Sequence, residues 1–153
     1  MAKQKSRDRV AQVAAAAGLE IEILEMPAST RTADEAAEAC GCALDQIVKS
    51  LIFAREDGAL ALFLIAGGNR LDPKRAEIAA GAPLSRADPA VVREVTGFAI
   101  GGVAPIGHLT DLPVYIDPRL MEFELVWAAA GAPNAVFSVA PGSLILATGA
   151  LPY

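Results

Sequence analysis

The sequence predicts a single α+β domain over residues 1–153, with a mixed, mostly antiparallel, barrel-like sheet of about seven strands and about five packed helices. Three observations support this prediction. Segments with helical periodicity and segments with strand-like alternation are interleaved along the whole chain. Hairpin signals connect successive strands directly, which favours a mixed sheet over a doubly wound parallel one. The length of 153 residues suits one domain that can bury a core.

The first quarter of the chain predicts a helix, a strand and a second helix. Residues 6–17 are rich in alanine, have helical apolar spacing and end at Gly18. The run LEIEILEM, residues 19–26, alternates apolar and acidic residues, which is typical of a half-buried strand. Thr32 is placed to cap the second helix, which ends at Gly41.

The rest of the chain alternates strands with short helices. Residues 47–55 predict a strand, Asp57-Gly58 predicts a hairpin, and the run ALALFLIAGG predicts a fully buried strand whose glycines form a turn. Two helices then begin with an aspartate cap before proline, at Asp72-Pro73 and Asp88-Pro89, and each ends at a glycine. The remaining segments predict four strands and a C-terminal helix: 98–103, 112–117, 123–131, 135–140 and 141–149.

Composition and charge exclude several classes of protein. The longest apolar run, residues 59–66, is far shorter than the roughly 20 residues that span a bilayer, so no membrane segment is expected. The basic N-terminus lacks the apolar core of a secretory signal, which favours the cytoplasm. A net charge of −5 disfavours binding to duplex DNA, although a local basic patch is compatible with it.

The sequence lacks the motifs of most familiar catalytic sites. It contains no phosphate-binding G-x-x-x-x-G-K-[ST] or G-x-G-x-x-G motif, and any serine-type triad would have to use His108, the single histidine. Cys40 and Cys42 provide two of the four ligands that a structural zinc site needs. We therefore expect no metal, no cofactor and two reduced thiols.

Two segments could carry chemistry of another kind. Lys49 lies among apolar residues in DQIVKSLIF; it is either a lysine whose ammonium reaches solvent or a cationic anchor at a pocket floor. In the run GGVAPIGH, Gly101 and Gly102 permit a ligand to approach the main chain, and Pro105 stiffens the loop. This loop is either a tight turn between strands or a binding surface made of main-chain groups.

Four segments in order resemble the YbaK/EbsC family: TADEAAEACGCALDQIVKSLIF, RLDPKRAEIAAG, TGFAIGGVAPIGH and LPVYID. The resemblance covers about residues 8–150. This family includes free-standing aminoacyl-tRNA deacylases related to the editing domain inserted in bacterial prolyl-tRNA synthetases. It implies hydrolysis of the ester between a wrong amino acid and the 3′ end of a tRNA, without a metal, by a positioned water and in some members with the ribose hydroxyl of the tRNA.

The resemblance also assigns residues. Lys49 matches the family lysine and is the predicted catalytic residue, and Gly101 to Pro105 match the G-x-x-x-P loop of the aminoacyl pocket. The predicted substrate-binding residues are Gly101, Gly102, Val103, Ala104, Pro105, His108, Ala129 and Gly131. The implied partners are the acceptor end of an aminoacyl-tRNA and an aminoacyl-tRNA synthetase.

One departure bears on specificity. Where YbaK carries a serine before polar and acidic residues, this chain has Ala129 in the stretch AAAGAPNAVF. We therefore expect a pocket for alanine, serine or threonine rather than for cysteine. Two alternatives stay open at this point: a non-catalytic module that binds a tRNA or a synthetase, and a hydrolase of small esters or amides outside translation.

Overall fold

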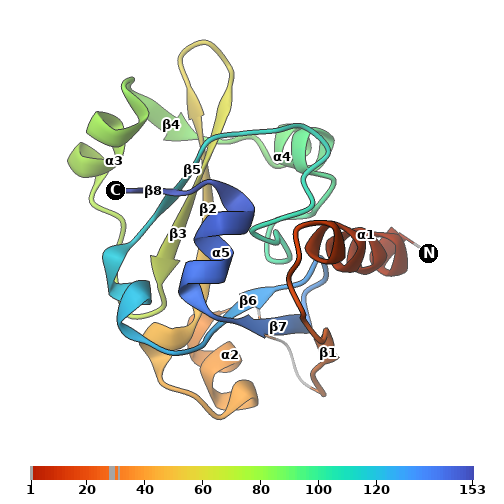
Figure 1. Ribbon diagram of the computed structural model, residues 1–153. Coiled ribbons are helices and arrows are strands. Elements are labelled where there is room, and N and C mark those ends of the chain that lie inside the picture. The colour runs from red at the N-terminus through yellow and green to blue at the C-terminus, as the bar shows by residue number, and fades with distance from the viewer. Residues whose placement is uncertain (1, 28–29, 31) are drawn as a thin grey trace.

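Two β-sheets pack around a shared core and are covered by short helices (Figure 1). The computed structural model describes residues 2–27, 30 and 32–153. In this part of the chain the helices are α1 (Ala2–Ala16), α2 (Ala33–Cys40), α3 (Pro73–Ala80), α4 (Pro89–Thr96) and α5 (Pro141–Thr148), and the 3₁₀ helices are η1 (Leu44–Gln46) and η2 (Pro118–Glu122). The strands are β1 (Leu24–Glu25), β2 (Val48–Arg55), β3 (Leu60–Ala66), β4 (Leu84–Arg86), β5 (Val114–Ile116), β6 (Val126–Ala129), β7 (Ala135–Val139) and β8 (Leu151–Pro152).

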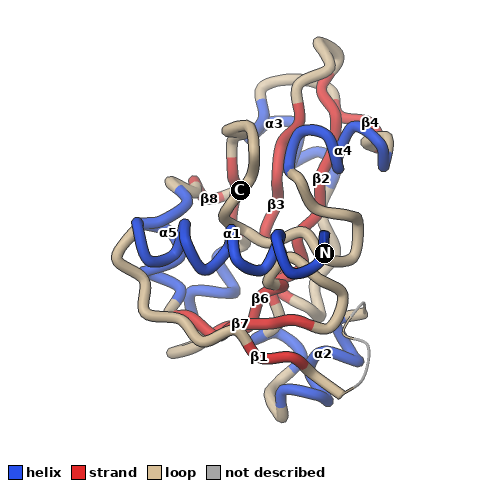
Figure 2. The backbone as a smooth tube through the Cα atoms, turned by 90° about the vertical axis from the view of Figure 1, so that its right-hand side faces the viewer, coloured by secondary structure: helices blue, strands red, loops and turns tan. Residues whose placement is uncertain are grey.

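The larger sheet has the order β4-β2-β3-β5-β8, and the smaller has the order β1-β7-β6. Four strand pairings are antiparallel, whereas β3–β5 and β5–β8 are parallel. This confirms the mixed, mostly antiparallel α+β domain. The two sheets do not close into a barrel: among the described residues, the strand pairing between them is limited to one isolated bridge, from Ile47 just before β2 to Trp127 of β6. Figure 2 shows the smaller sheet lying across one end of the long β2–β3 hairpin.

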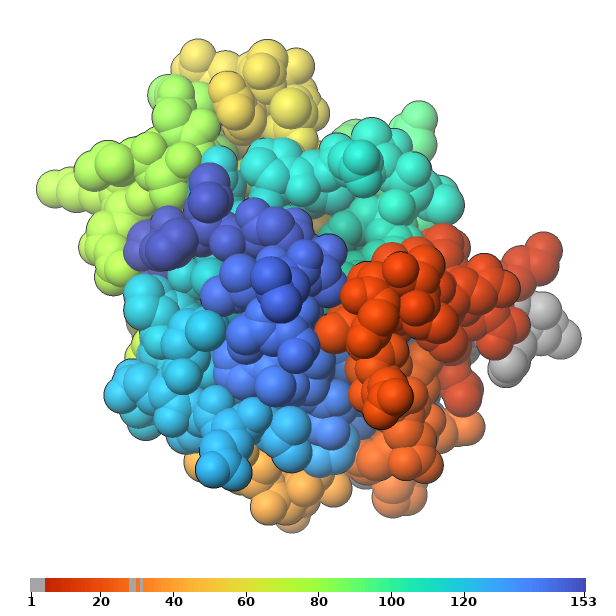
Figure 3. Space-filling view, viewed as in Figure 1, coloured from red at the N-terminus to blue at the C-terminus, as the bar shows by residue number. Residues whose placement is uncertain are grey.

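The central strand β3 is buried along its whole length, as predicted. One face packs into a core that includes α1, α4, α5 and both sheets, and the other packs against α3. Figure 3 shows α1 and α5 lying next to each other on the surface that covers the first core. None of the described helices combines the length and the apolar character needed to cross a bilayer.

The helix ends follow the predicted local chemistry. Thr32 forms a reciprocal capping box with Glu35 at the start of α2. Asp72 and Asp88 cap α3 and α4, each followed by proline. Helices α2 to α5 each end at a glycine with a left-handed backbone, such as Gly97 with φ of 79°.

Two strand predictions need correction, and two short strands were missed. Residues 98–103 form turns rather than a strand, because the segment after Gly97 bends back on itself and Gly101 has φ of +94°. The predicted strand over 19–26 shrinks to β1, since only these residues pair with β7. Strands β4 and β8 were not predicted, because two or three residues are too few to show an alternating pattern.

Candidate functional site

A cavity of about 320 Å³ opens between β2, the start of α2, β6, β7 and the loop residues Ile100, Gly101 and Val103. Its walls are mainly apolar. Small side chains, including Ala33, Ala36, Ala128 and Ala129, border part of it. The polar side chains on its wall are Thr30, Thr32, Lys49 and Ser50. An apolar cavity with a few polar groups is the usual form of a small-molecule site.

The structure brings together four of the predicted site residues at this cavity. Lys49 lies on the β2 wall, Gly101 and Val103 on the loop wall, and Ala129 on the β6 wall. The other five predicted residues, Gly102, Ala104, Pro105, His108 and Gly131, are not among those that line the cavity. Gly102, Ala104 and Pro105 belong to the loop itself, and His108 and Gly131 lie in the layer behind it. The roles of all five in substrate binding stay predictions.

This second layer fixes the shape of the loop. The ring nitrogen Nε2 of His108 donates to the carbonyl of Ala104, 2.7 Å away, because a carbonyl oxygen can only accept. A Cβ on Gly102 would lie 3.2 Å from the main chain of Ala132, and one on Gly131 would lie 3.0 Å from that of Ser6. Both glycines therefore permit a close main-chain approach that a side chain would disturb.

Arg9 of α1 holds the same loop at its ends. Its Nε donates to the carbonyl of Gly107 at 2.6 Å, and Nη2 donates to the carbonyl of Thr96 at 3.3 Å. Its guanidinium also lies 4.6 Å from the ring centroid of Phe98. The loop is thus anchored to α1 through one arginine, which sequence reasoning did not identify.

Burial affects the titration of His108. The pKa of this imidazole lies below its ordinary value of 6.5, mainly because burial disfavours the charged form. The hydrogen bond to Ala104 opposes this shift, and the nearby Arg9 adds to it. We conclude that His108 is neutral at pH 7 and braces the loop.

Lys49 is oriented by the turn that follows β3. Its Nζ donates a hydrogen bond to the main-chain carbonyl of Asn69. An ammonium has three N–H donors, so this bond leaves others for a ligand. The pKa of Lys49 is lowered, first by burial and then by Arg70, whereas Asp117 and Asp45 act to raise it.

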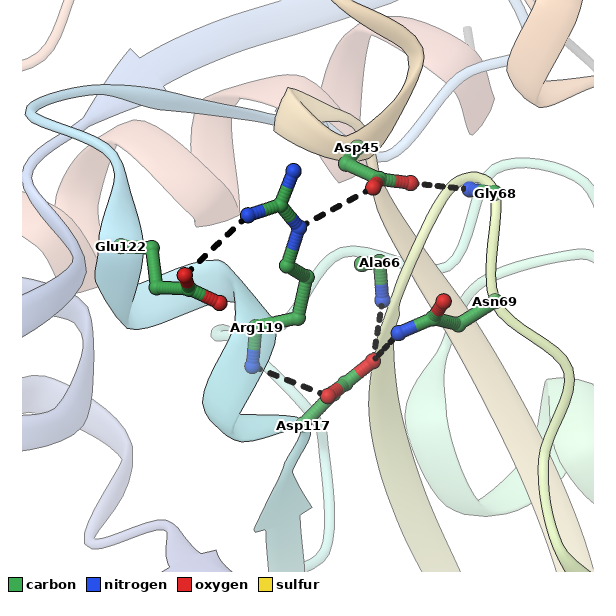
Figure 4. Close-up of polar contacts among 7 residues, drawn as sticks. All are labelled: Asp45, Ala66, Gly68, Asn69, Asp117, Arg119 and Glu122. Atoms are coloured by element: carbon green, nitrogen blue, oxygen red, sulfur yellow. Dashed lines mark hydrogen bonds and ion pairs between the residues drawn. The ribbon is translucent and has the colours of Figure 1, made fainter.

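Asp117 holds this turn in place from inside the protein (Figure 4). It is only 6% exposed, and its Oδ2 accepts hydrogen bonds from the main-chain nitrogen of Ala66 at 3.1 Å and from Nδ2 of Asn69 at 2.9 Å. Its Oδ1 accepts a hydrogen bond from the main-chain nitrogen of Arg119 at 3.0 Å, and Asp117 thereby caps the N-terminus of η2. One buried carboxylate therefore links the end of β3 to the residue that orients Lys49.

Asp45 fixes the turn from the other side. Its Oδ1 accepts from the main-chain nitrogen of Gly68 at 2.8 Å, and its Oδ2 accepts from Nε of Arg119 at 3.1 Å (Figure 4). A Cβ on Gly67 would lie 2.2 Å from the carbonyl oxygen of Leu44, so only glycine permits this approach. The prediction that Gly67 and Gly68 form a turn is confirmed, and the Asn69 carbonyl that follows them accepts the hydrogen bond from Lys49.

The two cysteines are free thiols. Burial, followed by the neighbouring Cys42, raises the pKa of the Cys40 thiol to about 11. A thiol with such a pKa is a poor nucleophile and a poor metal ligand at neutral pH. Within the described residues, no group of three or more histidine, cysteine, aspartate or glutamate side chains could hold a metal ion.

Sequence reasoning missed several residues of the site. Thr30 and Trp127 line the cavity, and Asn69 and Asp117 orient Lys49. A usable signal was present for Asp117, which precedes proline like the caps at Asp72 and Asp88. No local pattern reveals that its carboxylate also reaches Asn69, because 48 residues separate the two.

Comparison with known proteins gives consistent matches. The family model of the aminoacyl-tRNA editing domain matches residues 27–145. The uncharacterized protein YwhH of Bacillus subtilis (strain 168) is 35% identical over 125 residues, which are 82% of this chain and 80% of that protein. Proline--tRNA ligase of Shouchella clausii (strain KSM-K16) is 35% identical over 97 residues, which are 63% of this chain but 17% of the ligase.

Solved structures agree over nearly the whole chain. One, described as a candidate trans-editing enzyme for prolyl tRNA synthetase, has a TM-score of 0.91 and 49% identity and covers 97% of this chain and 94% of that one. The hypothetical protein APE2540 has a TM-score of 0.87 and 33% identity, with 94% and 96% covered. The fold and the cavity thus define a small α+β domain of the tRNA-editing class.

The chain belongs to the aminoacyl-tRNA editing domain family. This confirms the family resemblance predicted from the sequence, including the relation to the editing domain of prolyl-tRNA synthetases. Residues 2–26, which include α1 and Arg9, precede the region that the family model matches.

Proposed function

We propose that this protein is a trans-editing hydrolase that removes a small amino acid, such as alanine, serine or threonine, from a mischarged tRNA. The observation that carries the proposal is that Lys49 lines one cavity with Gly101 and Val103. A cation and a main-chain loop can orient an ester and stabilise its transition state without a side-chain nucleophile.

The reaction needs only water as co-reactant. Water adds to the carbonyl carbon of the ester, the bond to the ribose oxygen breaks, and that oxygen takes up a proton. The products are a free amino acid and a tRNA. In this proposal Lys49, which keeps N–H donors beyond its bond to Asn69, stabilises the oxygen that becomes negatively charged.

The cavity also suggests the size of the amino acid. The bordering residues Ala33, Ala36, Ala128 and Ala129 leave room without offering a group that would bind one side chain specifically. A pocket of this kind separates substrates mainly by size, and one methylene changes binding by about 1–3 kcal/mol. We infer a preference for small side chains with modest discrimination among them, in the cytoplasm where tRNA is charged.

A panel of mischarged tRNAs tests the proposal. Alanyl-, seryl- and threonyl-tRNA should lose their ester with multiple turnover, and a tRNA charged with an aromatic amino acid should be spared. Lys74→Ala serves as a control because Lys74 is exposed on α3 and does not line the cavity. The proposal fails if no charged tRNA is hydrolysed by the folded protein.

Ala129 favours one second candidate, a module that binds charged tRNA or a synthetase without hydrolysis. This residue lines the cavity but has no hydroxyl, whereas YbaK has a serine at the matching position. Stable complexes with charged tRNA and no loss of ester would support that candidate. Multiple turnover on any member of the panel would exclude it.

A further inference from the structure

One edge of β2 has a gap in its strand pairing. Strand β3 pairs with β2 along the other edge, from Val48 to Ala54. On the gapped edge, Ile47 bridges to Trp127 of β6, and pairing resumes only where Phe53 lies opposite Arg86 of β4. No described strand pairs with residues 48–52 on this edge.

Two cavities lie along this gap. The second has a volume of about 240 Å³ and is lined by residues 50–53 of β2, by Arg86, Ala87 and Val92, and by the loop. Both cavities share Ser50, Leu51, Ile100, Gly101 and Val103 on their walls. They are therefore neighbouring parts of one groove, with β2 on one side and residues 100–103 on the other.

The main chain of Ser50 faces the groove. In β3, the main-chain groups of Leu62 and Leu64 form hydrogen bonds with residues of or next to β5. The main-chain N–H and C=O groups of the alternate residues Phe63 and Ile65 therefore point toward β2. Their partners Leu51 and Lys49 are thus bonded to β3, and Ser50 between them points its N–H and C=O toward the gap. The Oγ of Ser50 is also buried without a hydrogen-bond partner among the described residues.

The main-chain groups and the hydroxyl of Ser50 are suited to bind a polar ligand. Buried main-chain and hydroxyl groups in proteins nearly always have partners, and one left unsatisfied costs about 1–3 kcal/mol. Phe53 lies four residue steps beyond Lys49, which corresponds to roughly 13 Å along β2. An extended aminoacyl group spans only about 3.5 Å of this length. The groove is therefore longer than the aminoacyl group alone requires.

A cation lies at the far end of the groove. Arg86 is exposed and lines the second cavity, and its side chain makes no hydrogen bond or ion pair with a described residue. Its planar guanidinium suits the two-pronged recognition of a phosphate. The walls formed by Ala87, Val92 and Ile100 are apolar, as the face of a nucleobase requires.

We propose that the second cavity is the nucleotide subsite of this groove. The 3′-terminal nucleotide of the tRNA lies in it with a phosphate bound by Arg86, and the esterified amino acid extends past Ser50 to Lys49. This assignment rests on the proposed function, because it takes aminoacyl-tRNA as the ligand.

Two substrates that differ in phosphate content test the subsite. One is alanyl-tRNA, and the other is alanine esterified to adenosine, which has no phosphate. We expect Arg86→Ala to raise KM for alanyl-tRNA about tenfold, as the loss of one charge-assisted contact would, and to leave hydrolysis of the alanyl-adenosine unchanged. Arg86→Lys should recover part of the loss.

Arg93→Ala is the matched control, because Arg93 is exposed on the adjacent α4 and does not line the groove. It removes the same charge and should leave KM for alanyl-tRNA unchanged. The subsite assignment is overturned if Arg86→Ala and Arg93→Ala weaken the tRNA reaction equally, or if Arg86→Ala impairs both substrates to the same extent.

Binding without turnover separates this proposal from the catalytic one. The affinity of uncharged tRNA, measured by fluorescence anisotropy over a range of salt concentrations, should fall in Arg86→Ala, and the salt dependence should lose about one phosphate contact. Binding that depends on Arg86 without any ester hydrolysis would reject the enzyme and keep the subsite. Binding that is unaffected by Arg86→Ala would reject the subsite alone.

Discussion

The replacement of Asp117 by alanine should destabilise the protein and release Lys49. The change removes a carboxylate that accepts three N–H groups, from Ala66, Asn69 and Arg119, at 2.9–3.1 Å. A hydrogen bond to a charged group contributes about 1.5–3 kcal/mol, but water can replace part of it at the more exposed donors. We therefore expect a loss of about 3–5 kcal/mol in the free energy of unfolding.

The size of this loss makes it easy to measure. For a domain of this length, 1 kcal/mol corresponds to about 2–4 °C in Tm, so Tm should fall by roughly 6–20 °C. Asp117→Asn should lose about half as much, because one oxygen is kept and an amide N–H₂ faces a donor. Urea unfolding gives the free energies, and deacylation at a temperature where both variants are folded gives the effect on kcat.

Glu122→Gln provides the control for Asp117. Glu122 belongs to the same network through Arg119, but its side chain is 61% exposed. An exposed ion pair contributes about 0–1 kcal/mol, so Tm should change little. The account of the turn would be refuted if Asp117→Ala had the Tm of the wild type, or if folded Asp117→Asn kept the full kcat.

Two further predictions concern the layer behind the loop. Arg9→Ala should lower the free energy of unfolding by about 2 kcal/mol, because it removes two hydrogen bonds to carbonyls and a contact with Phe98, and a mischarged-tRNA panel should show a weaker preference for small amino acids. The control Arg7→Ala, which removes an ion pair to the 62% exposed Glu25, should leave that preference intact. Equal effects of the two variants would contradict the role of Arg9 in holding the loop. Because burial lowers the pKa of His108 below 6.5, the folded state binds fewer protons, so stability should fall as pH decreases from about 6.5. His108→Gln should lose this dependence in urea titrations between pH 7 and 5, and an unchanged slope would show that His108 does not cause it.

Local signals made most of the fold predictable. The caps at Thr32, Asp72 and Asp88 and the buried run of β3 depend on residues close in sequence, so the chain reveals them directly. The arrangement of two separate sheets depends on which edge of β2 is left unpaired. That edge is determined by tertiary contacts such as the bridge from Ile47 to Trp127, which no local pattern contains.

The site was predictable only in part for the same reason. Lys49 and the loop glycines were found because an isolated cation in an apolar run and a glycine-rich bend are visible in sequence. The residues that orient them, Arg9 and Asp117, act over separations of 98 and 48 residues. Arginine and aspartate at such positions look like ordinary surface residues until the fold places them.

Single-turnover hydrolysis of alanyl-tRNA by the wild type, Lys49→Ala and Lys49→Arg tests the central claim most directly. If the Lys49 ammonium stabilises the transition state, Lys49→Ala should lose about 10²–10³ in rate, the usual effect of removing one such donor. Lys49→Arg should stay impaired because its guanidinium cannot keep the same geometry. A folded Lys49→Ala variant that hydrolyses alanyl-tRNA at the wild-type rate would contradict the account.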